Sequence, residues 1–292
     1  MKLPKPHYRS IFVSDVHFGF KHNRSDLMAD FLRKSTCENL YLVGDIVDVW
    51  ELQRKFRWSL NDSLAVRQIL KKKRQGSNVF YLPGNHDGAI RSFINHIEVE
   101  GVEFANEFVH IGVDGRRYLV VHGDIFDSDT TAWTILSKIG GRAYDYSIII
   151  NAYINKIRAK IGKRPWSLSN FLKQRVKGAT HFIRRYEKHM IDYCSQGGYD
   201  GIICGHIHKA EIKTITSELY GDERMAYMNE HHLPLIYMNS GDWVESCTAL
   251  VENMDGSFEI IRWSDKKGNH YGQPADELRC DQQACPGPVS QD

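Results

Sequence analysis

The chain of 292 residues is 42% hydrophobic and 25% charged, which is typical of a globular protein and excludes a disordered or collagen-like chain. The first apolar run, residues 11–13, is too short for a signal peptide or a membrane-spanning helix, so we expect a cytoplasmic protein. Six cysteines without a C-x-x-C pair predict reduced thiols rather than a disulfide framework or a zinc knuckle.

The net charge of +2 conceals an uneven distribution along the chain. Residues 131–190 contain 13 Lys and Arg against 2 acidic residues, a balance of +11, whereas the remainder has 25 against 34, a balance of −9. A basic segment of this kind is either a solvated helix face or a surface for phosphates, nucleic acid or anionic lipid.

Five short apolar runs predict buried β-strands. Each is four residues long, is rich in β-branched and aromatic residues, and is closely followed by Gly, Asp, His or Asn; they are residues 10–13, 40–43, 79–82, 118–121 and 201–204. Amphipathic helices are predicted over residues 25–34 and from residue 61 or 62 to 74. Strands alternating with helices favour an α/β fold, in which function gathers at the carboxyl ends of the strands.

The later part of the chain changes character twice. Residues 131–193 show a helical pattern, and we predict a basic helical lid inserted over the strand ends. Short alternating segments at 211–216, 235–239, 248–253 and 258–263 predict antiparallel strands of a second sheet packed on the first. We expect residues 1–267 to form one domain and residues 268–292 a disordered tail.

Polar residues follow all five predicted strands and are therefore expected at one edge of the molecule. Single motifs such as Asp-x-His or Gly-His-x-His are weak evidence, but five such segments in order, each directly beyond a strand, are hard to explain by chance. The candidate metal ligands among them are Asp15, His17, Asp45, Asn85, His122, His206 and His208.

This donor set indicates the kind of metal centre. Four imidazoles, two carboxylates and an amide oxygen favour borderline metals such as Mn, Fe, Co and Zn over Ca or Mg alone. Seven ligands are too many for one catalytic ion that keeps an open position, and they suit two divalent ions about 3.5–4 Å apart with a shared carboxylate. We predict that Asp45 is the shared ligand.

The turn LPGNHDG, residues 82–88, places an amide, an imidazole and a carboxylate side by side. Asn85 would offer a metal a neutral oxygen, which preserves its Lewis acidity. His86 would remain free to contact a phosphate oxygen or the leaving group, and Asp87 would hold His86 in the required tautomer. His86 and Asp87 are therefore the candidate catalytic residues.

The segments SDVHFG, GDIVDVW, LPGNHDG, VHGD and CGHIH together resemble the calcineurin-like metallophosphoesterase superfamily over residues 8–264. The resemblance implies a four-layer α/β/β/α sandwich and hydrolysis of phosphoesters at two metals. It assigns Asp15, His17, Asp45 and His208 to one metal, and Asp45, Asn85, His122 and His206 to the other. It also implies that Asp48 contacts a ligand without itself binding metal.

Within the superfamily, the insertion before CGHIH and the aromatic residues of DVWELQRKFRW are similar to the UDP-2,3-diacylglucosamine hydrolases of lipid A synthesis. This similarity implies a manganese enzyme that cleaves a pyrophosphate to UMP and a diacylglucosamine 1-phosphate under a helical lid. Lys173 and Lys177 are candidate contacts for the diphosphate. Well-studied members carry Arg where this chain has His86, whereas His is the common choice elsewhere in the superfamily.

Several alternatives are compatible with the sequence. The expected partner is a phosphate-containing small molecule or a lipid-linked nucleotide, and a basic amphipathic lid would allow peripheral contact with the inner membrane surface. The alternative within enzymes is a phosphatase or phosphodiesterase for soluble nucleotides. A nuclease is disfavoured because the basic segment lacks an obvious stacking platform, so we expect no nucleic-acid partner. A non-catalytic scaffold is disfavoured because every ligand position is filled.

Overall fold

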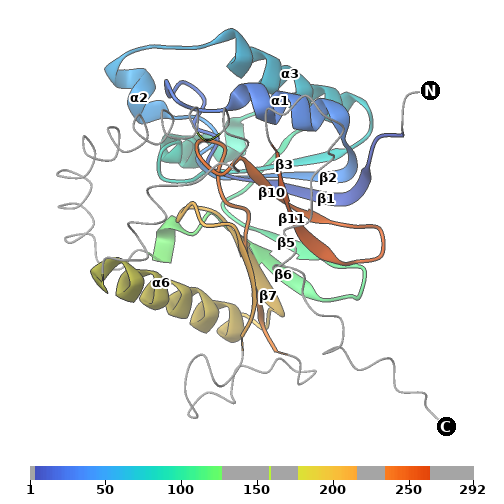
Figure 1. The fold of residues 1–292 in the computed structure, drawn as a ribbon, viewed down its shortest axis with the longest axis vertical. Helices are drawn as coiled ribbons and strands as arrows, with labels where there is room; N and C mark the ends of the chain where they lie inside the picture. Colours follow the sequence, from blue (N-terminus) through green and yellow to red (C-terminus); the bar gives the residue numbers. More distant parts are fainter. Residues whose placement is uncertain (1–3, 127–157, 159–176, 216–233, 264–292) are drawn as a thin grey trace.

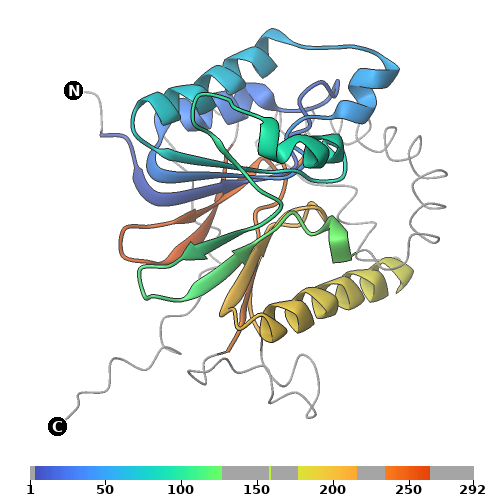
Figure 2. The same cartoon turned by 180° about the vertical axis from the view of Figure 1, so that it is seen from behind.

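The computed structural model describes residues 4–126, 158, 177–215 and 234–263. Two β-sheets pack face to face between outer helices (Figures 1 and 2). Helices α1 (Ser25–Lys34) and α3 (Leu60–Arg74) cover the outer face of the first sheet, and α6 (Lys177–Gln196) lies along the second. The described residues thus form the expected α/β fold with layers in the order α, β, β, α.

The first sheet has the strand order β11-β10-β1-β2-β3-β4. Strands β1 to β4 run parallel, and β10 is antiparallel to β1 with Ile11 opposite Val251. The strand bounds are β1 His7–Val13, β2 Thr36–Val43, β3 Asn78–Leu82, β4 Glu103–Phe104, β10 Thr248–Glu252 and β11 Phe258–Arg262.

The second sheet has the order β5-β6-β7-β9-β8. Strands β6, β7 and β9 are parallel, and β5 and β8 form antiparallel edges. The bounds are β5 Phe108–Ile111, β6 Arg117–Val120, β7 Gly201–Cys204, β8 Glu211–Thr214 and β9 Ile236–Asn239.

Each predicted strand is present, but β4 and β5 were not predicted, β9 is parallel to β7 instead of antiparallel, and the distribution of strands between the sheets differs from the prediction. The five apolar runs divide into β1, β2 and β3 of the first sheet and β6 and β7 of the second. The two C-terminal strands return to the first sheet beside β1, so both sheets are mixed. Every residue of β10 is buried because one face meets helices and the other meets the second sheet, and local alternation does not specify a strand's partner.

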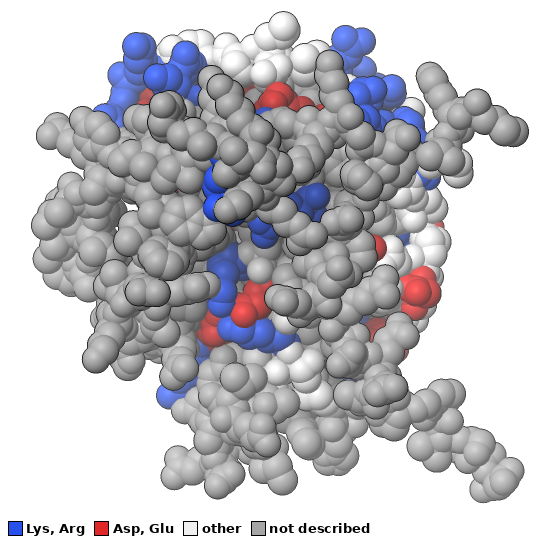
Figure 3. Space-filling model, in the orientation of Figure 1, with Lys and Arg blue, Asp and Glu red and all other residues white. Residues whose placement is uncertain are grey.

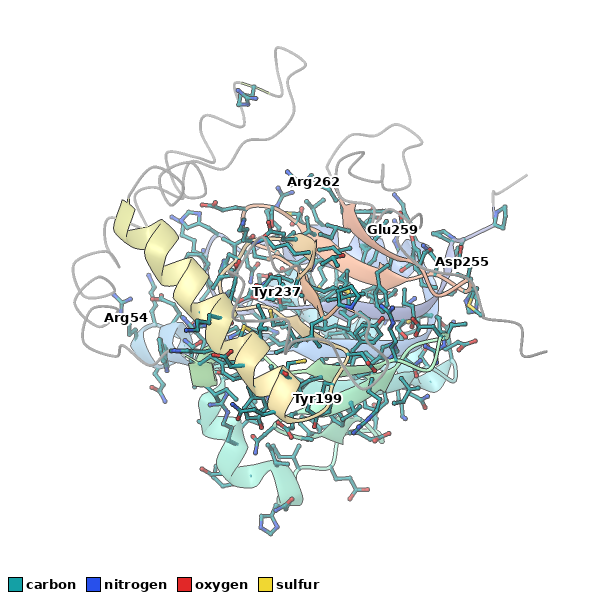
Figure 4. All side chains as sticks on the ribbon, turned by 90° about the horizontal axis from the view of Figure 1, so that it is seen from below. Arg54, Tyr199, Tyr237, Asp255, Glu259 and Arg262 are labelled. Carbon is teal, nitrogen blue, oxygen red and sulfur yellow. The ribbon has the colours of Figure 1, made fainter. Side chains whose placement is uncertain are left out.

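The predicted lid extends too far along the chain, because residues 177–193 belong to α6. Its residues Tyr186, Met190, Ile191 and Cys194 are buried in one cluster with Ile202 of β7. In Figure 4 this helix crosses the sheet beside Tyr237 of β9, another member of the cluster. Residues 177–193 are therefore part of a core layer, while residues 131–157 and 159–176 of the expected lid, and the tail 268–292, lie outside the described residues.

The carboxyl ends of the parallel strands gather at the end of the molecule where α2 (Val49–Arg54) lies, at the left of Figure 1. Figure 4 shows Arg54 of α2 at this end and Asp255, in the turn between β10 and β11, at the opposite end. Two 3-10 helices follow strands in the same region, η1 (Gly88–His96) after β3 and η2 (Asp124–Phe126) after β6.

Surface features bear on the expected partners. In the part of the chain that is described, none of the helices combines the length and apolar character needed to span a bilayer. In Figure 3 the described Lys and Arg side chains appear as separate groups, at both upper corners and between the grey segments. Eleven of the thirteen basic side chains of residues 131–190 are not described, so the predicted basic surface stays a prediction.

Candidate metal centre

All seven predicted ligands lie in loops that directly follow strands of the two sheets. Backbone hydrogen bonds join these loops, with Asp15 N donating to Gly44 O (3.1 Å), His17 N to Asp45 O (2.9 Å) and Gly205 N to His122 O (3.1 Å). Two further hydrogen bonds cross between the sheets, from His206 N to Asp15 Oδ2 (3.0 Å) and from His122 Nδ1 to Val43 O (2.9 Å), so the carboxyl ends of the strands in both sheets meet here.

Five of the seven candidate ligands have a left-handed backbone. Their φ angles lie between 51° and 68°, and the residues are Asp15, His17, Asp45, His206 and His208. A non-glycine residue with positive φ is uncommon and costs roughly 1–3 kcal/mol where the surrounding structure enforces it. Backbone strain is thus concentrated in the loops that follow the strands and present these side chains to the site.

The side chains form three overlapping groups whose ligand atoms lie within 4.8 Å of one another: Asp15, His17 and His208; His17, Asp45 and His86; and Asp45, His122 and His206. The Oδ2 atom of Asp45 lies 3.4 Å from Nε2 of His122 and 4.0 Å from Nε2 of His17. Asp45 therefore stands between the two ends of the cluster, as a shared carboxylate must.

Four buried ligand atoms of the cluster have no hydrogen-bond partner among the described residues, which would be costly unless a cation fills the space. They are Asp15 Oδ1, His17 Nε2, Asn85 Oδ1 and His122 Nε2. Nε2 of His208 lies 3.1 Å from Asp15 Oδ1, close enough for both atoms to bind one ion. The mixed nitrogen and oxygen donors fit divalent transition metals.

Two histidines have their tautomers set by neighbours outside the donor set. Nδ1 of His122 donates to the carbonyl oxygen of Val43 (2.9 Å), and Nδ1 of His17 lies 3.2 Å from Oδ2 of Asp48. In the neutral imidazole such partners hold the proton on Nδ1 and direct Nε2 at the site, as is usual for metal-binding histidines.

The cluster is strongly charged and its groups perturb one another. Burial alone would raise the pKa of Asp15, but the charge of His208 lowers it to about 2. Burial alone would lower the pKa of His17, yet Asp48 and Asp45 raise it to about 9. Burial would also lower the pKa of His122, but the charge of Asp45 raises it to about 10. The pKa of Asp45 is also lowered, by His122 against the effect of burial. Asp15 and Asp45 thus stay ionised, while the imidazoles of His17 and His122, in the absence of metal, hold protons that a metal must displace.

Glycines next to the ligands leave room for close approach. A Cβ at Gly84 would lie 2.7 Å from the backbone nitrogen of Asp45 and overlap its Oδ1, and a Cβ at Gly205 would overlap the Asp15 carboxylate. A side chain at either position would displace an oxygen of the cluster. These glycines are required by contact rather than by φ, because neither has a positive φ.

The family model for calcineurin-like phosphoesterases matches residues 8–210. The chain belongs to this family. Among curated proteins, it is 24% identical to the UDP-2,3-diacylglucosamine hydrolase of Histophilus somni (strain 2336), over 87% of this chain and 99% of that protein. The enzyme of the same name from Aliivibrio fischeri (strain MJ11) is 22% identical, over 86% and 96%.

Solved structures show more distant similarity. Zinc-complexed Vps29 of Entamoeba histolytica gives a TM-score of 0.40 at 13% identity, covering 89% of this chain and 94% of that chain. A predicted phosphoesterase from Streptococcus pneumoniae gives 0.38 at 10%, covering 92% and 93%.

In this phosphoesterase the structure corrects the expected partner of His86. The Asp87 carboxylate accepts hydrogen bonds from the backbone nitrogens of Gly84 (2.5 Å) and Ile46 (3.0 Å) and from the Tyr81 hydroxyl (2.5 Å). Asp87 is fully buried, and burial together with the Asp45 charge raises its pKa. Its position therefore holds two loops together instead of orienting His86.

Asp48 takes the role that the sequence had suggested for Asp87. Its Oδ1 lies 3.1 Å from Nδ1 of His86, while Oδ2 faces His17. The side chain also caps α2 by accepting from the backbone nitrogen of Glu51 (2.9 Å). One buried carboxylate thus orients both a candidate ligand and the candidate catalytic imidazole, because the start of α2 carries it between them.

Trp50 of α2 is a site residue that the sequence did not single out. Its ring lies over that of His86, with centroids 4.2 Å apart and an angle of 32°, and it is 52% exposed. The segment DVWELQRKFRW marked aromatic residues here, but no periodicity pointed to this contact.

The predicted substrate contacts are not tested by the structure. Lys173 lies outside the described residues. Lys177 is the first residue of α6, but its side chain is not among those described. Both remain predictions.

Proposed function

We propose that this phosphoesterase is a two-metal hydrolase that cleaves a pyrophosphate bond, with UDP-2,3-diacylglucosamine as its substrate and UMP and 2,3-diacylglucosamine 1-phosphate as products. The observation that carries the hydrolase assignment is the set of partnerless ligand atoms converging around Asp45. The substrate rests on the similarity to enzymes named for it, which extends over 87% of this chain.

The proposed ligand sets are Asp15, His17, Asp45 and His208 for one ion, and Asp45, Asn85, His122 and His206 for the other. We propose manganese, with Fe, Co or Zn as substitutes, because the donor set is borderline in character. When bound, two such ions supply Lewis acidity toward phosphoryl oxygens and lower the pKa of water at the site.

The chain's own residues position the reaction and move the proton. Hydrolysis forms a bond from water oxygen to phosphorus and breaks the bond from phosphorus to the leaving oxygen. Since Nδ1 of His86 faces Asp48, Nε2 is the ring atom available to donate a proton to that leaving oxygen. The Trp50 ring packs against the imidazole and limits its rotation.

The presence of His86 favours a second candidate, hydrolysis of soluble nucleotides or other phosphoesters. An imidazole held by a carboxylate serves a general acid role on any phosphoester, and does not by itself require a lipid. In the lipid case we propose that the protein acts in the cytoplasm, in peripheral contact with the inner membrane surface.

The decisive experiment gives the manganese-loaded protein UDP-2,3-diacylglucosamine in detergent and measures UMP release by mass spectrometry. We expect release by the wild type and loss of release in Asp45→Ala, with bis(p-nitrophenyl) phosphate as a second substrate. If the aryl diester is hydrolysed and no UMP appears, the lipid substrate is wrong and the soluble candidate stands. If neither substrate is hydrolysed, the hydrolase proposal itself is wrong.

A further inference from the structure

A cleft of about 260 Å³ opens directly beside His122, and its lining residues come from loops other than the one that carries Asp48. Its polar residues come from two segments: Asn106 and Glu107 precede β5, and Arg91 lies in η1. Asp124 and Ile125 of η2 complete it. The cleft meets the metal centre because His122 lines it and has a buried, partnerless Nε2.

An ion pair gives the cleft a rigid side. Nη2 of Arg91 donates to both oxygens of Asp124 (2.9 Å each) and to the carbonyl oxygen of Pro83 (3.0 Å). The pair ties the turn that carries Asn85 to the loop that carries His122, across the two sheets. Within the described part of the chain, Nε and Nη1 of Arg91 make no hydrogen bond, so two donor positions of the guanidinium stay available.

The segment before β5 offers the cleft both acceptors and donors. The Tyr193 hydroxyl of α6 is hydrogen-bonded to Glu107, whose charge raises the pKa of Tyr193. Asn106 is exposed and supplies a carboxamide with both a donor and an acceptor. Ile125, at 59% exposure, adds an apolar surface at the entrance.

The charge and size of the cleft restrict its ligand. Two carboxylates, Glu107 and Asp124, face one guanidinium, so a second anionic group is disfavoured. A volume of about 260 Å³ is below the roughly 300–1,000 Å³ of clefts that hold a whole drug-sized ligand. The cleft therefore fits one neutral part of a substrate that carries alternating hydrogen-bond donors and acceptors.

We propose that this cleft binds the nucleobase of a nucleotide substrate whose phosphate reacts at the metal centre. A pyrimidine edge such as that of uracil presents acceptor, donor and acceptor in a row, which Asn106, Glu107 and Arg91 complement, and its flat ring packs on Ile125. The inference rests on the proposed phosphoester hydrolysis and adds to it the residues that select a nucleotide.

The test compares two chromogenic diesters with the manganese-loaded full chain. One is the p-nitrophenyl ester of UMP, and the other is bis(p-nitrophenyl) phosphate, which has no base. The variants are Glu107→Gln and Asn106→Ala, with Glu38→Gln and Asn61→Ala as controls at exposed positions on β2 and α3. Calorimetric titration with UMP measures binding separately from turnover.

For each cleft variant we expect kcat/KM on the UMP ester to fall about tenfold, through KM, with the aryl diester and both controls unchanged. The proposal is overturned if both substrates lose activity equally, or if neither does. If the wild type hydrolyses neither diester, the proposed function fails and the UMP titration decides the cleft: weaker binding in Glu107→Gln supports it, and unchanged or absent binding overturns it.

Discussion

Asp48 offers the most direct test of how the site is organised. Its Oδ1 accepts from the Glu51 backbone nitrogen (2.9 Å) and lies 3.1 Å from His86 Nδ1, and its Oδ2 lies 3.2 Å from His17 Nδ1. In Asp48→Asn one oxygen becomes an NH₂ group. Because Oδ1 accepts the hydrogen bond that caps α2 and also faces His86, we expect the remaining oxygen to stay there and the NH₂ group to face His17.

A donor opposite Nδ1 of His17 drives its proton to Nε2, the atom that should bind metal. Loss of such a supporting partner typically reduces metal affinity about 10–100-fold, or about 1.4–2.8 kcal/mol. The helix cap survives, since Asn and Asp cap equally well, whereas Asp48→Ala would add a capping loss of about 0.5–2 kcal/mol.

The assay is manganese titration followed by the electron paramagnetic resonance signal of free Mn²⁺, alongside hydrolysis of the aryl diester. Glu51→Gln, on the same turn of α2, is the matched control and should bind metal normally. Wild-type manganese affinity together with wild-type hydrolysis in Asp48→Asn would refute the tautomer argument. Normal affinity combined with slow hydrolysis would instead show that the amide had turned and disabled His86.

Three further predictions concern protons, sterics and the core. His17 and His122, with pKa values raised to about 9 and 10, are protonated at neutral pH without metal, so manganese affinity should rise as the pH increases from 6 toward 9. Calorimetry in buffers of different ionisation enthalpy should detect the proton release that accompanies binding. A manganese affinity that does not depend on pH would contradict this prediction. In Gly84→Ala the new Cβ would lie 2.6 Å from His122 Cδ2 and overlap Asp45, so this variant should lose metal-dependent hydrolysis. Gly88→Ala, with open space around its Cβ, should retain hydrolysis. Equal activity of the two variants would refute the steric argument. Glu252 is buried between the Arg9 guanidinium (2.8 Å) and His110 (2.8 Å). The substitution Glu252→Gln should lower the free energy of unfolding by about 3–5 kcal/mol, measured by urea denaturation, while metal binding persists. Burial alone would raise the Glu252 pKa, but the hydrogen bond and charge of His110 lower it, so its contribution should be present above about pH 4.5 and fade at lower pH.

The sequence by itself determined the parts of this protein that depend on local pattern. Four-residue apolar runs became β1, β2, β3, β6 and β7, and the helix predicted over residues 25–34 has those bounds as α1. The gathering of Asp15 and Asp45 also followed from the sequence, because residues directly beyond parallel strands emerge at one end of a sheet. His122 joins them from the second sheet, and the packing of the two sheets decides that contact.

Tertiary structure decided which elements became partners. The alternation in β10 predicted a strand, but only packing placed that strand beside β1. Only the burial of Tyr186 and Met190 showed that the end of the expected lid is a core helix. Likewise, Asp87 is adjacent to His86 in sequence, yet its carboxylate turns to the backbone of Gly84 and Ile46, and Asp48 from another strand's loop reaches the imidazole instead. A sequence pattern indicates which face of a strand or helix is buried. Hydrogen-bond partners depend instead on the directions in which the loops leave their strands. These directions are set by contacts between segments that are distant in the chain.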